Sequence, residues 1–181
     1  MGETESASLD VRRLSLGDFE RYSALRLEGL IEFPAAFTTD ADAWRDAPRS
    51  TLEAHVGPDR PDSPVLGAWL GTDGPIGLLG MNREQRRSVS HKAGLWGFYV
   101  ARPYRGRGVG RRLVTEMIVV ARKAGIRQLR AVVPTSSIAA LSLLDDLGFE
   151  RYGLERDARL VEGAFHDQVY LVRLLSEPTI E

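Results

Sequence analysis

A glycine-rich stretch, Arg105–Gly110, carries the strongest chemical signal in the sequence. It reads Arg-Gly-Arg-Gly-Val-Gly, and it separates an apolar run ending at Val100 from a helix-like run beginning at Val109. Such a turn exposes backbone N–H groups at a helix N-terminus, where the helix dipole also favours an anion. Five arginines lie in or beside this stretch of a nearly neutral chain: Arg102, Arg105, Arg107, Arg111 and Arg112. The pattern predicts a binding site for a phosphate-bearing ligand.

Two common phosphate motifs do not fit this stretch. A P-loop requires G-x-x-x-x-G-K-[ST], and Arg111-Arg112 stands where Lys followed by Ser or Thr belongs. A dinucleotide fingerprint requires G-x-G-x-x-G followed by a βαβ unit with an acidic ribose ligand, and the sequence has neither the spacing nor the unit. A third pattern, [Q/R]-x-x-G-x-[G/A], is matched by Arg105, Gly108 and Gly110.

The third pattern is typical of the GNAT superfamily of N-acetyltransferases, which the chain resembles over nearly all of residues 9–175. Leu95–Pro103 resembles the family's fourth strand and its lead into the loop. Ser137–Phe149 resembles the second signature, N-x-x-A-x-x-L-Y-x-x-x-G-F. The resemblance implies an α+β fold of three α/β layers. A mixed, mostly antiparallel central sheet of about seven strands would splay between strands 4 and 5 and be flanked by helices.

The resemblance also implies an acetyl-CoA site. Backbone N–H groups of the loop would bind the CoA pyrophosphate, and the pantetheine arm would pair with the fourth strand like an extra strand. A backbone N–H of that strand would polarise the thioester carbonyl. Ser137 replaces the family's asparagine, which contacts the arm. The implied cofactor-binding residues are Phe98, Tyr99, Val100, Arg105, Gly106, Arg107, Gly108, Val109, Gly110, Arg111 and Ser137.

Proton transfer cannot follow the family pattern in full. The family's frequent general acid, a tyrosine, falls at Leu144, which cannot protonate a leaving thiolate. Because thiols have a pKa near 8.5, CoA can also leave unprotonated. An alkyl amine acceptor, with a pKa near 10.4, still needs to lose a proton. His91 is a candidate base because histidine titrates near neutral pH. Tyr99 and Glu84 are weaker candidates, and deprotonation through water is the alternative.

The acceptor side leaves two chemistries open. Five acids could attract a cationic amine: Glu28, Glu32, Asp40, Asp42 and Asp167. Arg156 and Arg159 could instead bind a carboxylate-bearing acceptor. We expect transfer to the primary amine of a small molecule or amino-acid-like metabolite. The alternatives are a protein N-terminal or lysine acetyltransferase and a non-catalytic acyl-CoA-binding module.

Hydrophobic periodicity and turn residues predict the elements that position these groups. We expect helices over residues 18–31, 43–55, 109–124 and 137–147. We expect strands over residues 9–14, 65–70, 76–86, 90–100, 128–133, 151–161 and 164–175. The strand at 90–100 is apolar on both faces, which indicates a central, covered position. Gly97 within it indicates a bulge or a close backbone approach. The last two strands should form a hairpin across Glu162-Gly163.

Composition limits the functional classes. The 181 residues fit one N-acyltransferase domain over 9–176, preceded by a disordered tail at 1–8. A net charge of −1 gives no field to attract nucleic acid or an anionic membrane. No apolar run approaches ~20 residues and no signal peptide is evident, so we expect a cytoplasmic location. The lack of cysteine agrees with direct transfer without an acyl-cysteine intermediate. The three histidines are scattered, so we expect no metal site. The chain could form a homodimer.

Overall fold

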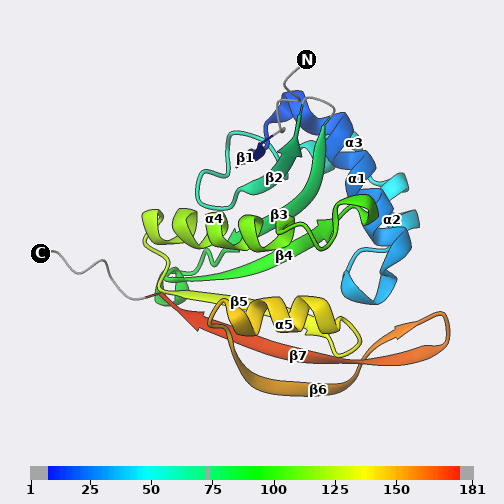
Figure 1. Cartoon of the computed structure of the whole chain (residues 1–181), viewed down its shortest axis with the longest axis vertical. Helices are drawn as coiled ribbons and strands as arrows, with labels where there is room; N and C mark the ends of the chain where they lie inside the picture. The colour runs from blue at the N-terminus through cyan, green and yellow to red at the C-terminus, as the bar shows by residue number, and fades with distance from the viewer. Residues whose placement is uncertain (1–7, 72–73, 176–181) are drawn as a thin grey trace, which may run out of the picture.

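Seven strands form one mixed sheet in a computed structural model that describes residues 8–71 and 74–175 (Figure 1). The sheet order is β1-β2-β3-β4-β5-β7-β6, and every neighbouring pair is antiparallel except β4 and β5. The strands are β1 Leu9–Arg13, β2 Val65–Leu70, β3 Pro75–Arg83, β4 Lys92–Val100, β5 Gln128–Pro134, β6 Glu150–Val161 and β7 Ala164–Leu174. The predicted sheet is therefore confirmed. Most of the predicted tail, residues 1–7, lies outside the described residues.

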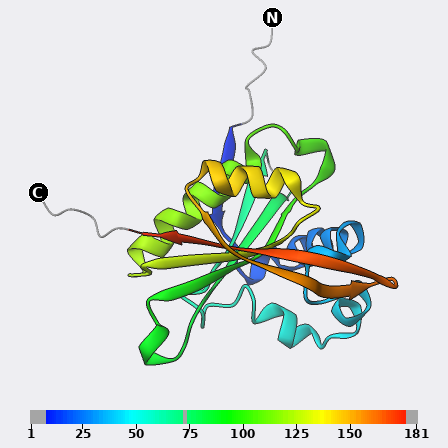
Figure 2. The ribbon, with the colours of Figure 1, turned by 90° about the horizontal axis from the view of Figure 1, so that it is seen from below.

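Helices cover both faces of the sheet (Figure 2). One face carries α4 and α5, and the other carries α1 with the short helices that follow it. The helices are η1 Leu16–Asp18, α1 Phe19–Glu32, η2 Pro34–Ala36, α2 Ala41–Asp46, α3 Arg49–Glu53, η3 Arg87–Val89, η4 Arg102–Tyr104, α4 Val109–Lys123 and α5 Ile138–Asp146. Two hydrophobic clusters result, one for each face of the sheet.

Helix α4 is the element that presents the glycine-rich loop. Its apolar residues recur at helical spacing, and Leu113, Met117 and Ala121 are fully buried against the sheet. Burying a side chain such as Leu113 contributes roughly 1.5–3 kcal/mol. The helix begins after Gly108 and ends before Gly125, and both glycines have positive φ, +80° and +73°. The amphipathic stripe therefore fixes where the loop lies relative to the strands.

The two central strands separate along most of their length. β4 and β5 pair only through Lys92–Gly94, which face Gln128–Arg130. Beyond Gly94, the β5 side of β4 has no strand partner among the described residues. Within this unpaired part, β4 carries one extra residue opposite β3 between Trp96 and Tyr99, and Gly97 has a φ of +69°. The predicted splay and the predicted irregularity at Gly97 are both present.

The structure corrects two expectations about secondary structure. The helix expected at residues 43–55 is two short helices, because Pro48 cannot donate a backbone hydrogen bond and the chain is extended at Ala47 and Pro48. The central strand β4 is also less covered than expected. Ala93 and Tyr99 are buried, whereas the residues between them are half-buried, because β4 has separated from β5 there.

The β6–β7 hairpin closes the far edge of the sheet. Glu162 and Gly163 form its turn with φ values of +51° and +79°, as a tight two-residue hairpin turn requires. Near the tip, the Arg159 Nη1 atom donates to the Phe37 carbonyl at 2.6 Å, directly after η2. The hairpin therefore reaches across to the segment that follows α1.

Candidate functional site

The loop before α4 presents its backbone to solvent. Gly106 and Gly108 adopt positive φ values of +72° and +80°, and both are exposed. A Cβ on either glycine would meet nothing within 4 Å, so the space outside the loop is open. Gly108 is the N-cap of α4, and no side chain caps the helix. The N–H groups of the first helical turn have no acceptor within the helix, so they are available to an anion.

The side chain of Arg105 turns away from this open space. Its guanidinium forms two hydrogen bonds with Glu32 at the end of α1, at 2.8 and 2.5 Å, and its Nε donates to the Val100 carbonyl at 2.8 Å. The hydrogen bonds from Arg105, with a further one from Tyr99, lower the pKa of Glu32 to about 2. The side chain of Arg105 therefore connects the loop to α1 and β4, and only the backbone of this residue remains available at the loop.

The other arginines near the loop differ in whether their guanidinium is paired with a carboxylate. Arg111 pairs with Asp146 of α5 at 2.7 Å, and Arg112 pairs with a glutamate one turn along α4. Arg107 is exposed, lies 5.9 Å from the centre of the Tyr104 ring, and has no carboxylate partner among the described residues. Arg107 is therefore available to meet a phosphate.

The loop packs directly on the fourth strand. A Cβ on Gly110 would lie 2.9 Å from the Phe98 ring, so the small residue lets α4 approach β4. Phe98 and Val100 are half-buried and lie against the α4-side hydrophobic cluster. The structure thus joins the loop, the start of α4 and the unpaired part of β4 in one place, as the resemblance implied.

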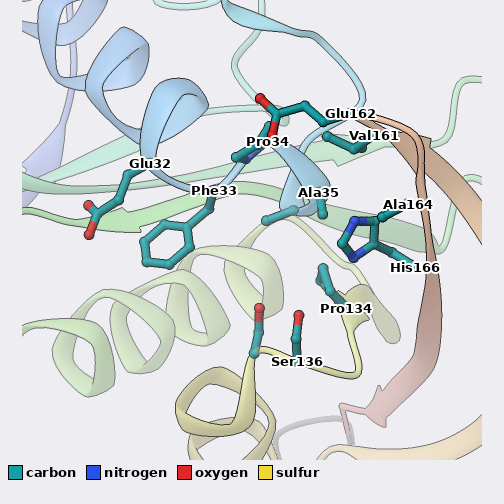
Figure 3. A pocket seen from close by; sticks show the side chains of 12 residues that line it. Glu32, Phe33, Pro34, Ala35, Pro134, Ser136, Val161, Glu162, Ala164 and His166 are labelled. Carbon is teal, nitrogen blue, oxygen red and sulfur yellow. The ribbon is translucent and has the colours of Figure 1, made fainter.

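A pocket of about 350 Å³ lies where β5 ends (Figure 3). Ser137 at the N-cap of α5 lines it, together with Phe33 and η2 on one side and the hairpin tip on the other. His166 of β7 is half-buried and forms part of the same wall. Ser137, which is predicted to contact the pantetheine arm, therefore meets η2 and the hairpin tip here. His166 was not among the predicted site residues, and only strand pairing in the hairpin places it in the pocket.

Tyr99 lies on the α1 face of β4. It is 3% exposed, and its hydroxyl lies 2.8 Å from a Glu28 oxygen and 2.7 Å from a Glu32 oxygen. Burial, together with these hydrogen bonds, raises the pKa of Tyr99 well above its ordinary value. The phenol is held between two carboxylates, so it does not face the open part of the site.

The structure does not bring His91 or Glu84 to the loop. His91 is exposed in the turn before β4, at the opposite end of that strand from Arg105, and its carbonyl accepts from the Arg127 and Gln128 N–H groups. Glu84 forms an ion pair with Arg130 beside the start of β5. Neither residue enters the mechanism proposed below.

The position of the family's tyrosine offers no proton donor. Leu144 is 5% exposed and belongs to the hydrophobic cluster between α5 and the sheet. Its side chain contributes to packing. A general acid at this position would also require an opening in that cluster.

The five acids proposed for a cationic acceptor are all engaged in local contacts. Glu28 and Glu32 bind the Tyr99 hydroxyl. Asp40 caps α2 by accepting from an N–H at 2.7 Å, and Asp42 pairs with an arginine of the same helix at 2.6 Å. Asp167 accepts the N–H of Asp157 at 2.9 Å. Of the five, Glu32 also lines the pocket, but its carboxylate is already bound by Arg105 and Tyr99.

The arginines proposed for a carboxylate-bearing acceptor do not line this pocket. Arg156 is exposed, but Arg159 reaches the Phe37 carbonyl, and its buried Nε has no partner among the described residues. Arg26 of α1, which sequence reasoning missed, is 5% exposed. Its position four residues after Tyr22 and four before Leu30 places it on the inward face of the helix. That spacing is a signal that could have identified it.

Among residues 8–71 and 74–175, no group of three or more histidine, cysteine, aspartate or glutamate side chains could hold a metal ion. Over the same residues, no helix is long and apolar enough to cross a bilayer.

Known proteins share both the sequence pattern and the fold. The sequence profile of the acetyltransferase (GNAT) family matches residues 28–149. A GNAT-family acetyltransferase from Streptococcus pneumoniae superposes with a TM-score of 0.83 at 23% identity, covering 93% of this chain and 100% of that one. A phosphinothricin acetyltransferase from Sinorhizobium meliloti, solved in complex with acetyl-CoA, gives 0.80 at 19%, covering 96% and 91%.

One curated relative matches more locally. The N-alpha-acetyltransferase RimI of Mycobacterium tuberculosis is 46% identical over 61 residues, which are 34% of this chain and 37% of that protein. The chain thus matches little more than a third of that relative's length. The profile match, however, extends from α1 through the glycine-rich loop to the end of α5. The chain belongs to the acetyltransferase (GNAT) family.

Proposed function

We propose that the chain transfers the acetyl group of acetyl-CoA directly to the primary amine of a small molecule. The observation that carries this proposal is the unpaired edge of β4 from Leu95 to Val100, which leads straight into the open loop before α4. An extended pantetheine arm suits the strand edge, and a pyrophosphate suits the first turn of the helix. Relatives solved with acetyl-CoA bound support the same cofactor.

The chain's own residues would act mainly by positioning. The backbone N–H groups at Gly106 and Gly108 and the first turn of α4 would hold the pyrophosphate, with Arg107 as a supporting charge. An N–H on the β4 edge near Phe98 would donate to the thioester carbonyl. Ser137 would offer one hydrogen bond to the arm. Acetyl-CoA supplies the acetyl group as a thioester.

The transfer needs no covalent enzyme intermediate. The amine nitrogen forms a bond to the acetyl carbon while the carbon–sulfur bond breaks, and the thiolate leaves with its electron pair. The acceptor attacks as the free amine, so an ammonium first loses one proton to water, and the nitrogen loses a second proton as the amide forms. Because Leu144 is apolar and buried, no side chain at that position protonates the thiolate. Rate enhancement then comes from orientation and from backbone hydrogen bonds to the carbonyl.

The shape of the acceptor side favours a small acceptor. The hairpin and η2 are joined by the Arg159–Phe37 hydrogen bond, and they face each other across a pocket of about 350 Å³. Pockets of this size typically hold small molecules. A protein N-terminus is the second candidate acceptor, because of the local 46% identity to RimI. A peptide would have to enter between two segments that touch.

The decisive experiment is acetyl-CoA turnover across a panel of amines, read by release of free thiol. The panel should contain amino acids, polyamines, aminoglycosides and short peptides with free N-termini. We expect rapid turnover with small amines and little with peptides. A preference for peptides would move the proposal to protein acetylation. Tight CoA binding by calorimetry without thiol release from any member would favour a non-catalytic acyl-CoA-binding module.

A further inference from the structure

A buried guanidinium without a counter-ion lies on the α1 face of the sheet. Arg26 is 5% exposed, and its Nε and Nη1 atoms have no hydrogen-bond partner among the described residues. Burial lowers the pKa of this guanidinium. Its Cζ atom lies 4.3 Å from the ring centre of Phe37, 5.7 Å from that of Trp96 and 5.8 Å from that of Trp44. The rings attract the cation, but they offer no strong hydrogen-bond acceptor.

Other unpartnered donors gather around the same place. Over residues 8–71 and 74–175, six buried side-chain nitrogen or oxygen atoms lack a partner, and four of them belong to Arg26, Trp96 and Arg159. The Trp96 ring centre lies 5.7 Å from the Arg26 Cζ atom, and the indole nitrogen lies over Gly80 of β3. Arg159 binds the carbonyl of Phe37, whose ring lies against Arg26. All four atoms are N–H donors. A carboxylate accepts hydrogen bonds only, so it is the complementary group.

The donors lie beside the predicted reaction centre. The Arg26 Nη1 atom is 3.5 Å from the position that a Cβ on Gly97 would take. Gly97 is the irregular residue of β4, at the point where that strand has left β5. A side chain at Gly97 would therefore be in van der Waals contact with the guanidinium, at the strand edge to which the thioester is assigned. A group bound at Arg26 would be held next to that edge.

We propose that Arg26, with the Trp96 indole N–H, binds the carboxylate of the acceptor, and that the acceptor is an α-amino acid or a similar amino-carboxylate. This inference rests on the proposed function, because it identifies the substrate class of that reaction. Arg26 and Trp96 are not among the residues that line the 350 Å³ pocket, and their link to the reaction centre is the contact of Arg26 with Gly97. The carboxylate neutralises the guanidinium, and the amine of the same molecule reaches the β4 edge at Gly97. Arg159, anchored on Phe37, adds positive charge on the hairpin side.

A purely structural role for Arg26 predicts a different outcome. Replacing a buried, unpaired charge by an apolar side chain of similar length is often neutral or stabilising. We therefore expect Arg26→Met to fold with unchanged or raised thermal stability while losing recognition of the carboxylate. If the arginine served only to pack against the rings, the substitution would lower thermal stability and leave acceptor preference intact.

The test measures recognition separately from turnover. Calorimetry on the protein saturated with CoA would compare common L-amino acids with the primary amide of each. We expect at least one acid to bind about 10- to 100-fold more tightly than its amide, as a hydrogen bond to a charged group would give. Arg26→Met should bring the two within about 2-fold. Arg45→Met removes an exposed arginine from the same layer and should leave the preference unchanged.

A second variant keeps the test decisive if Arg26→Met does not fold. Trp96→Phe removes the indole N–H and retains a ring, so it should reduce the acid preference only in part. Equal affinity for acids and amides, no binding of any acid, or a preference that survives both substitutions overturns the inference. Thiol release from acetyl-CoA with the same compounds decides the transfer reaction independently. Turnover without acid preference keeps the proposed function and removes this inference.

Discussion

The two halves of the candidate site differ in the groups that form them: backbone groups form one half and side chains the other. The proposed cofactor end consists of contiguous backbone, Arg105–Gly110 and the first turn of α4, with two glycines at positive φ. The acceptor end consists of side chains from α1, η2, β4 and the hairpin. Its contact between Arg159 and Phe37 joins residues 122 positions apart. A site made of contiguous backbone can be recognised from a short sequence pattern. A site made of side chains from distant segments can be recognised only in the folded structure.

The contrast extends to how each half should respond to substitution. A site made of backbone N–H groups depends on conformation, so glycine positions should matter most there. A site made of a few buried donors depends on particular side chains. Substitution of a glycine should therefore weaken the cofactor end most, whereas loss of a single side chain should matter most at the acceptor end.

Gly108→Asp should have the largest effect on cofactor binding, with at least about 100-fold loss of acetyl-CoA affinity. An aspartate at the N-cap would accept the N–H groups of the first turn and place a negative charge where the pyrophosphate belongs. It would also be strained at a φ of +80°. Calorimetry with acetyl-CoA measures the loss.

Gly125→Asp is the matched control for that experiment. Gly125 lies at the other end of α4, has a φ of +73°, and a Cβ on it would meet nothing within 4 Å. The substitution adds the same charge and a similar strain, of roughly 1–2 kcal/mol. We expect lower thermal stability with unchanged acetyl-CoA affinity. Retained affinity in Gly108→Asp would contradict the placement of the pyrophosphate.

Arg107→Ala should weaken acetyl-CoA binding by about 2- to 5-fold, the size expected for one exposed charge. Arg107 has no carboxylate partner among the described residues, so its charge is available to a phosphate. The loss should shrink as salt is raised, because ions screen exposed charges. Arg112→Ala is the control, since that arginine pairs with Glu116 at 2.8 Å. If Arg107→Ala lost more acetyl-CoA affinity than Gly108→Asp, the side chain of Arg107 and not the loop backbone would be the main contact to the cofactor.

The sequence predicted the local structure of the glycine-rich loop and α4 better than the arrangement of the acceptor end, because only the former depends on neighbouring residues in the chain. Glycine spacing and the apolar stripe of α4 are local patterns, and the splay of β4 from β5 followed from the family resemblance. Local spacing could not show that the Arg105 side chain turns to Glu32. Nor could it show that Leu144 is sealed in the core or that Arg26 lacks a counter-ion, because both depend on distant elements.

Glu32→Gln tests the joint between the two halves and should have a modest effect. Glu32 holds Arg105 of the loop and Tyr99 of β4, and its pKa is lowered from 4.5 to about 2. A lowered pKa stabilises the fold above about pH 4.5, and that stabilisation is lost as the pH falls towards 2. Because the side chain is 31% exposed, we expect less than about 1 kcal/mol.

Unfolding by urea across pH 2 to 7 measures this contribution. The difference in unfolding free energy between the wild-type protein and Glu32→Gln should be greatest above pH 5 and should close towards pH 2. Glu20→Gln, on the same helix but with its carboxylate 75% exposed, controls for the loss of one negative charge. A difference that does not change with pH would show that the ion pair with Arg105 is not what stabilises this joint.

His91→Gln should have the smallest effect, with less than a 2-fold change in kcat/KM and no change in the pH–rate profile. His91 precedes β4, whereas the loop follows it, and the nine residues of that strand span roughly 26 Å. Its exposed ring is therefore too far from the predicted thioester to accept a proton from the amine. His166→Gln is the matched variant inside the pocket, and it should raise the KM for the acceptor. Loss of the acidic limb of the profile in His91→Gln would place the base outside both halves and overturn the comparison.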